Sequence, residues 1–115
     1  MYIYSVLYII LAGSQENHNL IKLRQIRSKN ARVVWLHWEL PFCLKSNIQG
    51  QTVVYQEIDK YRKRLQKNYL ITGKYNKDYV IHGLKPHHSY AMSVVVQASG
   101  ANFISNEIII TTPNF

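Results

Sequence analysis

Apolar and polar residues alternate over most of this chain, and the alternation is clearest over residues 79–98. Every second position there is apolar on both sides of a corner that contains Leu84 and Pro86. Because successive side chains of a strand point to opposite faces, this period of two indicates half-buried antiparallel strands. Pro86 lacks a backbone donor, so it suits the corner and not a central strand.

The pattern predicts seven short strands joined by turn-rich segments. Residues 42–50 are expected to form a loop with Gly50 as its turn residue, and residues 99–106 a second loop. Strands of this length at this spacing indicate an all-β, seven-stranded immunoglobulin-like sandwich. The expected strands are 20–26, 32–39, 52–57, a short edge strand at 69–72, one strand around Tyr79, one around Tyr90, and 107–112.

The expected hydrophobic core consists of residues that share the inward phase of this alternation. On the second strand Leu36 and Trp38 belong to the inward face, whereas Trp35 belongs to the outward face. Lys22 and Arg24 are expected on the outward face of the first strand. The complete expected core is Val34, Leu36, Trp38, Val53, Tyr55, Tyr79, Ile81, Leu84, Pro86, Tyr90, Val94 and Val96.

The order and spacing of aromatic, proline and glycine residues resemble those of the fibronectin type III family over residues 20–113. Trp38 followed by Pro41 resembles the end of the family's second strand, and Tyr90 resembles its tyrosine corner. The resemblance implies one sandwich domain that binds or spaces partners and does not catalyse. Gln51 stands where the family usually has an inward tyrosine, so the third strand is expected to begin loosely or in a shifted register.

Residues 1–14 carry no charge and are mostly apolar. The segment is shorter than the roughly 20 residues that span a membrane, but it suits the apolar centre of a signal peptide. The alternatives are a misplaced gene start and the end of an upstream exon in a longer receptor. Polar residues 15–19 are expected to form a linker to the domain. We therefore expect an extracellular protein with no membrane span within this chain.

Positive charge is concentrated in segment 59–67, in a chain with 14 Lys and Arg, 6 Asp and Glu and a net charge of +8. A strand through this segment would place alternate cations on one face, and this basic ridge would suit a heparin-like polyanion or an acidic protein. The alternative is a solvated charge run that protects a sheet edge. Nucleic acid is less favoured, because only Tyr61 and Tyr69 lie near enough to stack on bases. The basic ridge comprises Lys60, Arg62, Lys63, Arg64 and Lys67.

Trp35 is the second candidate for an interaction surface. Its expected outward position beside Lys22 and Arg24 would suit an anchor for a protein partner, since Trp and Arg are frequent in binding hot spots. Alternatively, the two cationic side chains cover the ring through cation–π contact.

The sequence offers no set of residues for catalysis, metal binding or cofactor binding. His87 and His88 are adjacent and tend to diverge, whereas His37 and His82 are expected on two paired strands and could approach each other. Neither pair is completed by the ligands of a tetrahedral metal site. Cys43 is the single cysteine, so no internal disulfide can form. We expect a partly buried, unreactive thiol; an intermolecular bridge and a reactive thiol are the alternatives.

These observations predict a non-catalytic extracellular module for protein interaction or spacing, as in a receptor, adhesion or matrix protein. Its partner would be an unidentified protein, and it would need no cofactor. The alternative is a basic module that binds a heparin-like sugar or nucleic acid.

Overall fold

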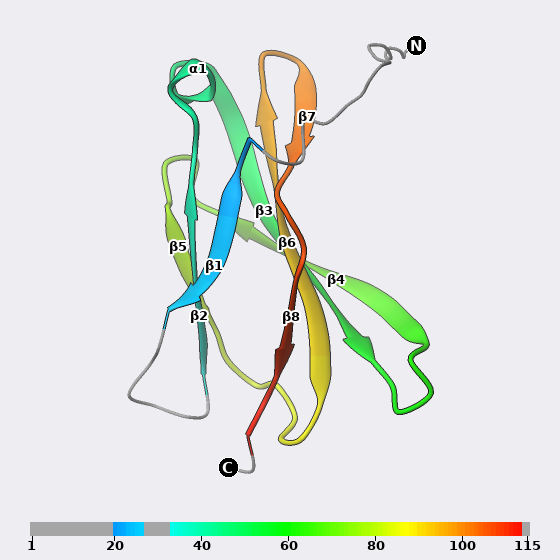
Figure 1. The fold of residues 1–115 in the computed structure, drawn as a ribbon. Helices are drawn as coiled ribbons and strands as arrows, with labels where there is room; N and C mark the ends of the chain where they lie inside the picture. Colours follow the sequence, from blue (N-terminus) through cyan, green and yellow to red (C-terminus); the bar gives the residue numbers. More distant parts are fainter. Residues whose placement is uncertain (1–19, 27–32, 114–115) are drawn as a thin grey trace.

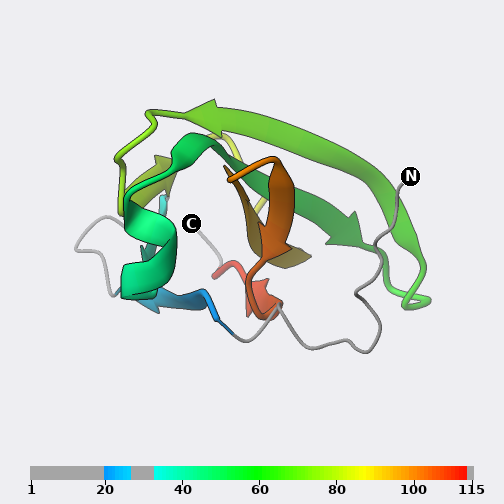
Figure 2. The same ribbon diagram turned by 90° about the horizontal axis from the view of Figure 1, so that it is seen from above.

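Two antiparallel sheets pack face to face in the computed structural model, which describes residues 20–26 and 33–113 (Figures 1 and 2). The three-stranded sheet has the order β1-β2-β5; the five-stranded sheet has the order β4-β3-β6-β7, with β8 also paired to β6. The expected signal peptide 1–14 and linker 15–19 lie outside the described residues. The elements are β1 (Lys22–Ile26), β2 (Val34–Glu39), α1 (Phe42–Lys45), β3 (Ile48–Ile58), β4 (Arg64–Thr72), β5 (Asp78–Ile81), β6 (Ser89–Ala98), β7 (Ala101–Ile104) and β8 (Ile108–Thr111).

Strands β3 and β6 form the centre of the five-stranded sheet. They pair antiparallel along their length, from Ile48 opposite Ala98 to Ile58 opposite Ser89. β6 is rich in valine, a β-branched residue that packs well on a pleated surface. Its alternate residues face the other sheet, and Met92 and Val94 are fully buried there. The prediction of an all-β immunoglobulin-like sandwich is therefore confirmed.

The eighth strand is β7, which lies in a segment predicted to be a loop, whereas the last predicted strand, 107–112, corresponds to β8. β7 pairs with the end of β6 and β8 pairs with its beginning. Between them, the Ser105 N–H donates to the Val94 carbonyl (2.9 Å), and the Ser105 hydroxyl accepts from the Val94 N–H (2.8 Å). The expectation of a loop throughout 99–106 is therefore wrong, since residues 101–104 form β7.

Three other boundaries differ from the sequence prediction. Segment 42–50 is not a single loop, because it contains α1 and the first residues of β3. Gly50 lies within β3, beside a register shift between Ile48 and Gly50, and is not a turn residue. β4 begins at Arg64, well before the expected edge strand at 69–72, because the chain turns back along β3 within the basic segment.

Most of the residues expected in the core belong to one buried cluster between the sheets. Tyr55 and Tyr79 are only partly buried and pack against this cluster. Pro86 is exposed, so its placement in the core is wrong. The chain leaves the three-stranded sheet after Ile81 and enters the five-stranded sheet at Ser89. At this corner the Tyr90 hydroxyl accepts from the Lys85 N–H (3.0 Å). The buried members are Val34, Leu36, Trp38, Val53, Ile81, Leu84, Tyr90, Val94 and Val96.

Gln51 anchors the beginning of β3 through a buried polar network. Its Oε1 accepts from the Trp38 indole N–H (2.9 Å), while its Nε2 donates to the carbonyls of Gly73 (3.1 Å), Lys74 (3.1 Å) and Asn76 (2.7 Å). Gln51 is 1% exposed. A loose strand beginning is therefore wrong at this residue, because one amide connects β2, β3 and the β4–β5 connection. The other expectation, a shifted register, agrees with the shift between Ile48 and Gly50.

Candidate interaction surface

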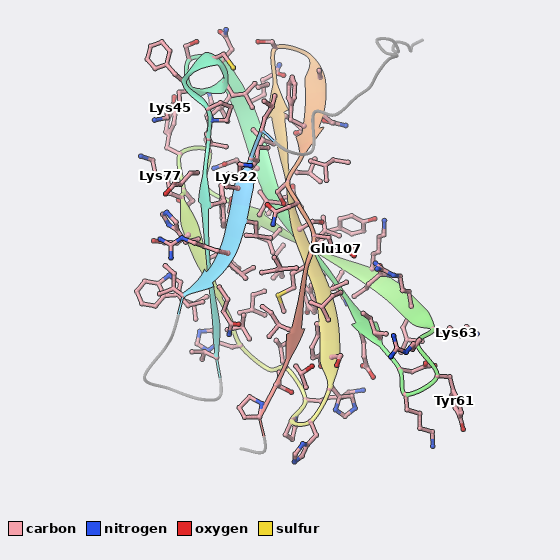
Figure 3. All side chains as sticks on the ribbon, viewed as in Figure 1. Lys22, Lys45, Tyr61, Lys63, Lys77 and Glu107 are labelled. Atoms are coloured by element: carbon pink, nitrogen blue, oxygen red, sulfur yellow. The ribbon has the colours of Figure 1, made fainter. Side chains whose placement is uncertain are left out.

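The loop between β3 and β4, residues 59–63, is named here the basic loop. Asp59 shapes it: one carboxylate oxygen accepts from the N–H groups of Tyr61 (2.9 Å) and Lys63 (2.8 Å). Backbone hydrogen bonds from Asp59 to Lys63 and from Arg62 to Asp59, both 2.9 Å, close the turn. Arg62 adopts the left-handed conformation, with a φ of 65°. The loop projects from the sandwich at the far end of the β3–β4 hairpin, with Tyr61 and Lys63 at its tip (Figures 1 and 3).

The predicted basic ridge is therefore not a continuous strand. Lys60, Arg62 and Lys63 lie in the basic loop, and only Arg64 and Lys67 belong to β4. The expectation of alternate cations along one strand is wrong, because the Asp59 hydrogen bonds reverse the chain within this segment.

Arg64 is engaged in an ion pair across the five-stranded sheet. Its two terminal nitrogens donate to the two carboxylate oxygens of Glu107 at 2.8 and 2.7 Å, and one of them also donates to the Gln56 side chain (3.1 Å). The hydrogen-bonded contact raises the pKa of the Arg64 guanidinium. The same contact lowers the pKa of the Glu107 carboxyl below its usual value. Arg64 therefore has an internal anionic partner, whereas no salt bridge to the cations of the basic loop is found in the part of the chain that the structure describes.

The outer sheet face, the side of the five-stranded sheet that faces away from the other sheet, carries rows of apolar side chains. Val53 belongs to the core, so its neighbours in β3 point outward. Thr52 lies opposite Ile71 on one side and Val95 on the other, and Val95 lies opposite Ile104. One row of mainly apolar side chains thus crosses the sheet from β4 to β7.

Large side chains on this face remain accessible to solvent. Tyr69 lies opposite Val54, in the row next to the one that contains Ile71. Ile109 lies opposite Ala91, at the other end of the face. Single exposed apolar residues are common on protein surfaces, but several on one sheet face are characteristic of interaction sites. The exposed fractions are 83% for Ile71, 63% for Tyr69, 55% for Ile109 and 48% for Ile104.

Trp35 lies on the outside of the three-stranded sheet, away from the basic loop. Its neighbours across the strands are Ile26 and Val80, and its ring is partly buried. Lys22 is opposite Glu39 and not beside the ring. The cation–π contacts found among the described residues involve Lys60 with Tyr61 and Lys74 with Tyr75, not Trp35. Trp35 is therefore packed among apolar neighbours and is less available than Tyr69.

The histidines do not come together. His37 lies opposite Asp78, because the β2–β5 register pairs Val34 with Ile81; His82 lies beyond the end of β5. The approach of His37 and His82 that the sequence allowed therefore does not occur.

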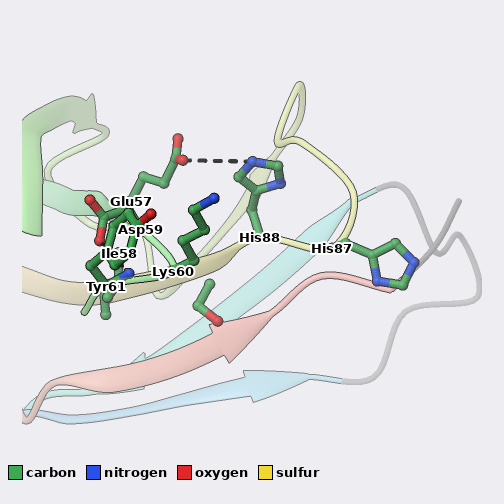
Figure 4. A pocket seen from close by; sticks show the side chains of 8 residues that line it. Glu57, Ile58, Asp59, Lys60, Tyr61, His87 and His88 are labelled. Carbon is green, nitrogen blue, oxygen red and sulfur yellow. Dashed lines mark hydrogen bonds and ion pairs between the residues drawn. The ribbon is translucent and has the colours of Figure 1, made fainter. Parts of the chain in front are cut away.

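His88 lies at an open recess of about 400 Å³ beside the basic loop (Figure 4). Its Nε2 lies 3.7 Å from a Glu57 carboxylate oxygen, and its Nδ1 lies 2.6 Å from the Pro86 carbonyl. His87 also lines this recess, with its ring turned away from that of His88 (Figure 4). Within residues 20–26 and 33–113, no three His, Cys, Asp or Glu side chains come close enough to hold a metal ion.

Cys43 lies in α1 and is exposed. The expectation that it would be partly buried is therefore wrong. The short helix presents it to solvent because Leu44, not Cys43, points into the core.

The family model for the fibronectin type III domain matches residues 21–111. The chain belongs to the fibronectin type III family. The family resemblance found in the sequence is thus confirmed. Among curated proteins none matches this chain. No helix within the described part of the chain is long and apolar enough to cross a membrane.

Several solved fibronectin type III domains share this fold at low sequence identity. The domain of human collagen alpha-1(XX) chain is 14% identical with a TM-score of 0.66, covering 91% of this chain and 90% of that one. The third domain of human KIAA0343 protein is 21% identical with a TM-score of 0.59, covering 91% and 92%. The domain of human contactin 1 is 16% identical with a TM-score of 0.61, covering 83% and 75%.

The sequence prediction did not include the outer sheet face as an interaction surface. The signal was present in the alternation of Lys67, Tyr69 and Ile71 with Asn68 and Leu70. Because the preceding residues are predicted to form a basic ridge, the sequence predicts only a short edge strand here.

Proposed function

We propose that this fibronectin type III domain is a non-catalytic extracellular module that binds a protein partner, as part of a receptor, adhesion or matrix protein. Domains of this family are generally non-catalytic modules in receptors and adhesion proteins. The observation that carries the proposal is the outer sheet face, where Ile71, Tyr69 and Ile104 are all substantially exposed. Spacing between neighbouring domains is the simpler role, and it would not require such a surface.

Physical chemistry supports binding through this face. Fully burying a large apolar side chain contributes about 1.5–3 kcal/mol, and these side chains do not make that contribution in the isolated domain. Tyr is also frequent among the residues that dominate protein interfaces. A partner that covers Tyr69 and Ile71 would therefore gain affinity without any change in the fold.

A fusion of the chain to an antibody Fc region tests this proposal on a panel of cultured cell types. We expect binding that protease treatment of the cells removes and that the double variant Tyr69→Ser, Ile104→Ser weakens at least tenfold. Val80→Ser is the matched control, because Val80 is 38% exposed on the outside of the other sheet. Equal binding by the double variant and the control would contradict the proposal.

The extracellular location is part of the same proposal. It is supported by the family and by the uncharged segment 1–14. Expression with the native N-terminus in a secretory cell should give a secreted product that begins near Gln15. Cytosolic protein that begins at Met1 would contradict an extracellular role.

A second candidate function is polyanion binding through the basic loop. Lys60, Arg62 and Lys63 are exposed, and no salt bridge to them is found among the described residues. The Asp59 hydrogen bonds hold their backbone in one conformation. Three cations on a projecting, ordered loop could meet a sulfated sugar without steric hindrance from the sandwich.

A heparin column tests this second candidate. Replacing Lys60, Arg62 and Lys63 with Gln should move elution to markedly lower salt, because the loss of local charge weakens a screened electrostatic contact. The matched control replaces Lys22, Lys45 and Lys77 with Gln. These three lysines lie on the other side of the molecule (Figure 3). If both triple variants elute at the same salt, binding reflects net charge alone and the basic loop is not a site.

A further inference from the structure

Strand β4 is the longest edge strand of the sandwich. It has nine residues, whereas β1 has five and β5, β7 and β8 have four each. Within the described chain β4 pairs with β3 and is the end of its sheet. Its other side therefore presents backbone donors and acceptors that a further strand could use.

The usual protection of a sheet edge is weak along most of β4. Residues 67–72 pair with β3 in an uninterrupted register and contain no proline or glycine. The register shift lies at the other end, between Gln56 and Ile58. Lys67 is the single charged residue in this stretch. Proline, bulges and charges are the features that discourage added strands, and residues 67–72 have only one of them.

The opposite edge of the same sheet is protected differently. It is divided into β7 and β8, and Asn106 between them is tied to β1. The Leu23 N–H donates to the Asn106 side-chain oxygen (2.7 Å), and the Asn106 side-chain nitrogen donates to the Leu23 carbonyl (3.1 Å). Strand addition is therefore favoured at β4 and not at the β7–β8 edge.

Charge indicates what kind of strand would fit. The basic loop precedes β4, and the exposed Lys74 follows it. The nearby acidic groups are engaged: Glu107 with Arg64, and Asp59 with backbone N–H groups of the basic loop. Along the chain, the exposed apolar side chains Tyr69 and Ile71 lie between the basic loop and Lys74.

We propose that the β4 edge binds an extended segment of a partner protein as an added strand, with an alternating apolar centre and acidic residues at both ends. The proposal rests on the proposed function, and it specifies which kind of partner segment would bind at the β4 side of the outer sheet face. Main-chain hydrogen bonds would supply affinity, and contacts to Tyr69 and Ile71 would supply specificity. A second copy of this chain is the less suitable occupant, because it would bring two sets of like charges together.

A synthetic peptide tests this inference on the full chain. The probe has the sequence Glu-Glu-Thr-Val-Thr-Tyr-Thr-Val-Glu-Glu, with blocked ends, and its matched control has Lys in place of every Glu. Titration into ¹⁵N-labelled protein should shift the amide resonances of residues 67–72 most strongly. We expect the Lys peptide to bind at least tenfold more weakly, and binding of the Glu peptide to weaken as salt is raised.

Two variants locate the site. Ile71→Lys should weaken the Glu peptide at least tenfold, whereas Ile109→Lys should change its affinity less than twofold. Ile109 is a matched control because it is exposed on the same outer sheet face but belongs to β8. Retained dispersion of the ¹⁵N spectrum establishes that each variant is folded.

Several results would overturn the inference. These are equal binding of the two peptides, absence of binding by the Glu peptide, and resonance shifts centred outside β4. A concentration-dependent dimer in sedimentation that Ile71→Lys converts to monomer would assign the edge to a second copy. The proposed function fails separately: it fails when cell binding does not depend on Tyr69 and Ile104, whatever the peptide does.

Discussion

The inner and outer surfaces of the five-stranded sheet are built from the same strands but have opposite properties. On the inner surface Val53, Met92 and Val94 are fully buried, and the polar Gln51 has a partner for each of its side-chain groups. On the outer sheet face Ile71 is 83% exposed. Strand alternation thus separates the residues that stabilise this domain from residues that remain available to a partner.

Because of this difference, substitutions at neighbouring residues of one strand should change the free energy of unfolding by different amounts. Loss of an inner side chain removes buried area and leaves a cavity, and both effects lower the free energy of unfolding. Loss of an exposed side chain removes little buried area, so the free energy of unfolding should hardly change. The exposed positions of the outer sheet face can therefore vary in sequence without loss of the fold.

The inner and outer positions should differ most in the free energy of unfolding when the two tryptophans of β2 are substituted. Trp38→Ala should lower the free energy of unfolding by about 3–5 kcal/mol, because Trp38 is fully buried. Trp35→Ala should cost about 1 kcal/mol, since that ring is only partly buried. Chemical denaturation monitored by circular dichroism measures both. Equal costs would show that β2 has its faces reversed.

Gln51→Leu should lower the free energy of unfolding by about 2 kcal/mol, even though leucine is apolar and similar in size. The substitution leaves the Trp38 indole N–H without its acceptor, and a buried unsatisfied donor costs about 1–3 kcal/mol. The double variant Trp38→Phe, Gln51→Leu should lose less stability than the sum of the two single losses, because the indole donor and its acceptor are removed together. A single variant as stable as wild type would contradict the network.

Loss of the Arg64–Glu107 pair should have the smallest effect on the free energy of unfolding, and this effect should depend on pH. Because the folded-state pKa of Glu107 is lowered, the pair contributes stability above the usual carboxyl pKa of 4.5. That contribution should disappear as the pH falls through the lower folded-state pKa. Glu107→Gln should therefore be less stable than wild type at pH 7 but equally stable at low pH. Arg64→Gln should reproduce this profile, and a difference that persists at low pH would contradict it.

Most of the sandwich was predictable from sequence because it depends on short-range alternation. Val94 and Val96 reveal their burial through the two-residue period alone. Gln51 could not be predicted in the same way, since its partners Gly73 and Asn76 become neighbours only after the sheets assemble.

The interaction surface was less predictable for the same reason. Arg64 belongs to a basic run in the sequence, but its charge is paired with Glu107, which is distant along the chain. The local turn around Asp59 also places Lys60, Arg62 and Lys63 in a loop before β4. Tyr69 was considered only as an aromatic near the basic ridge, because its exposure depends on which strands pair beside it.

The central claim is that the exposed apolar residues of the outer sheet face are not needed for the fold. The most direct test makes the same Ile-to-Ala substitution on each surface and measures the free energy of unfolding by chemical denaturation. Ile110→Ala, at a residue only 6% exposed, should lose about 2–5 kcal/mol. Ile71→Ala should stay within about 0.5 kcal/mol of wild type. A comparable loss at both positions would show that Ile71 is packed in the domain, and would contradict its availability to a partner.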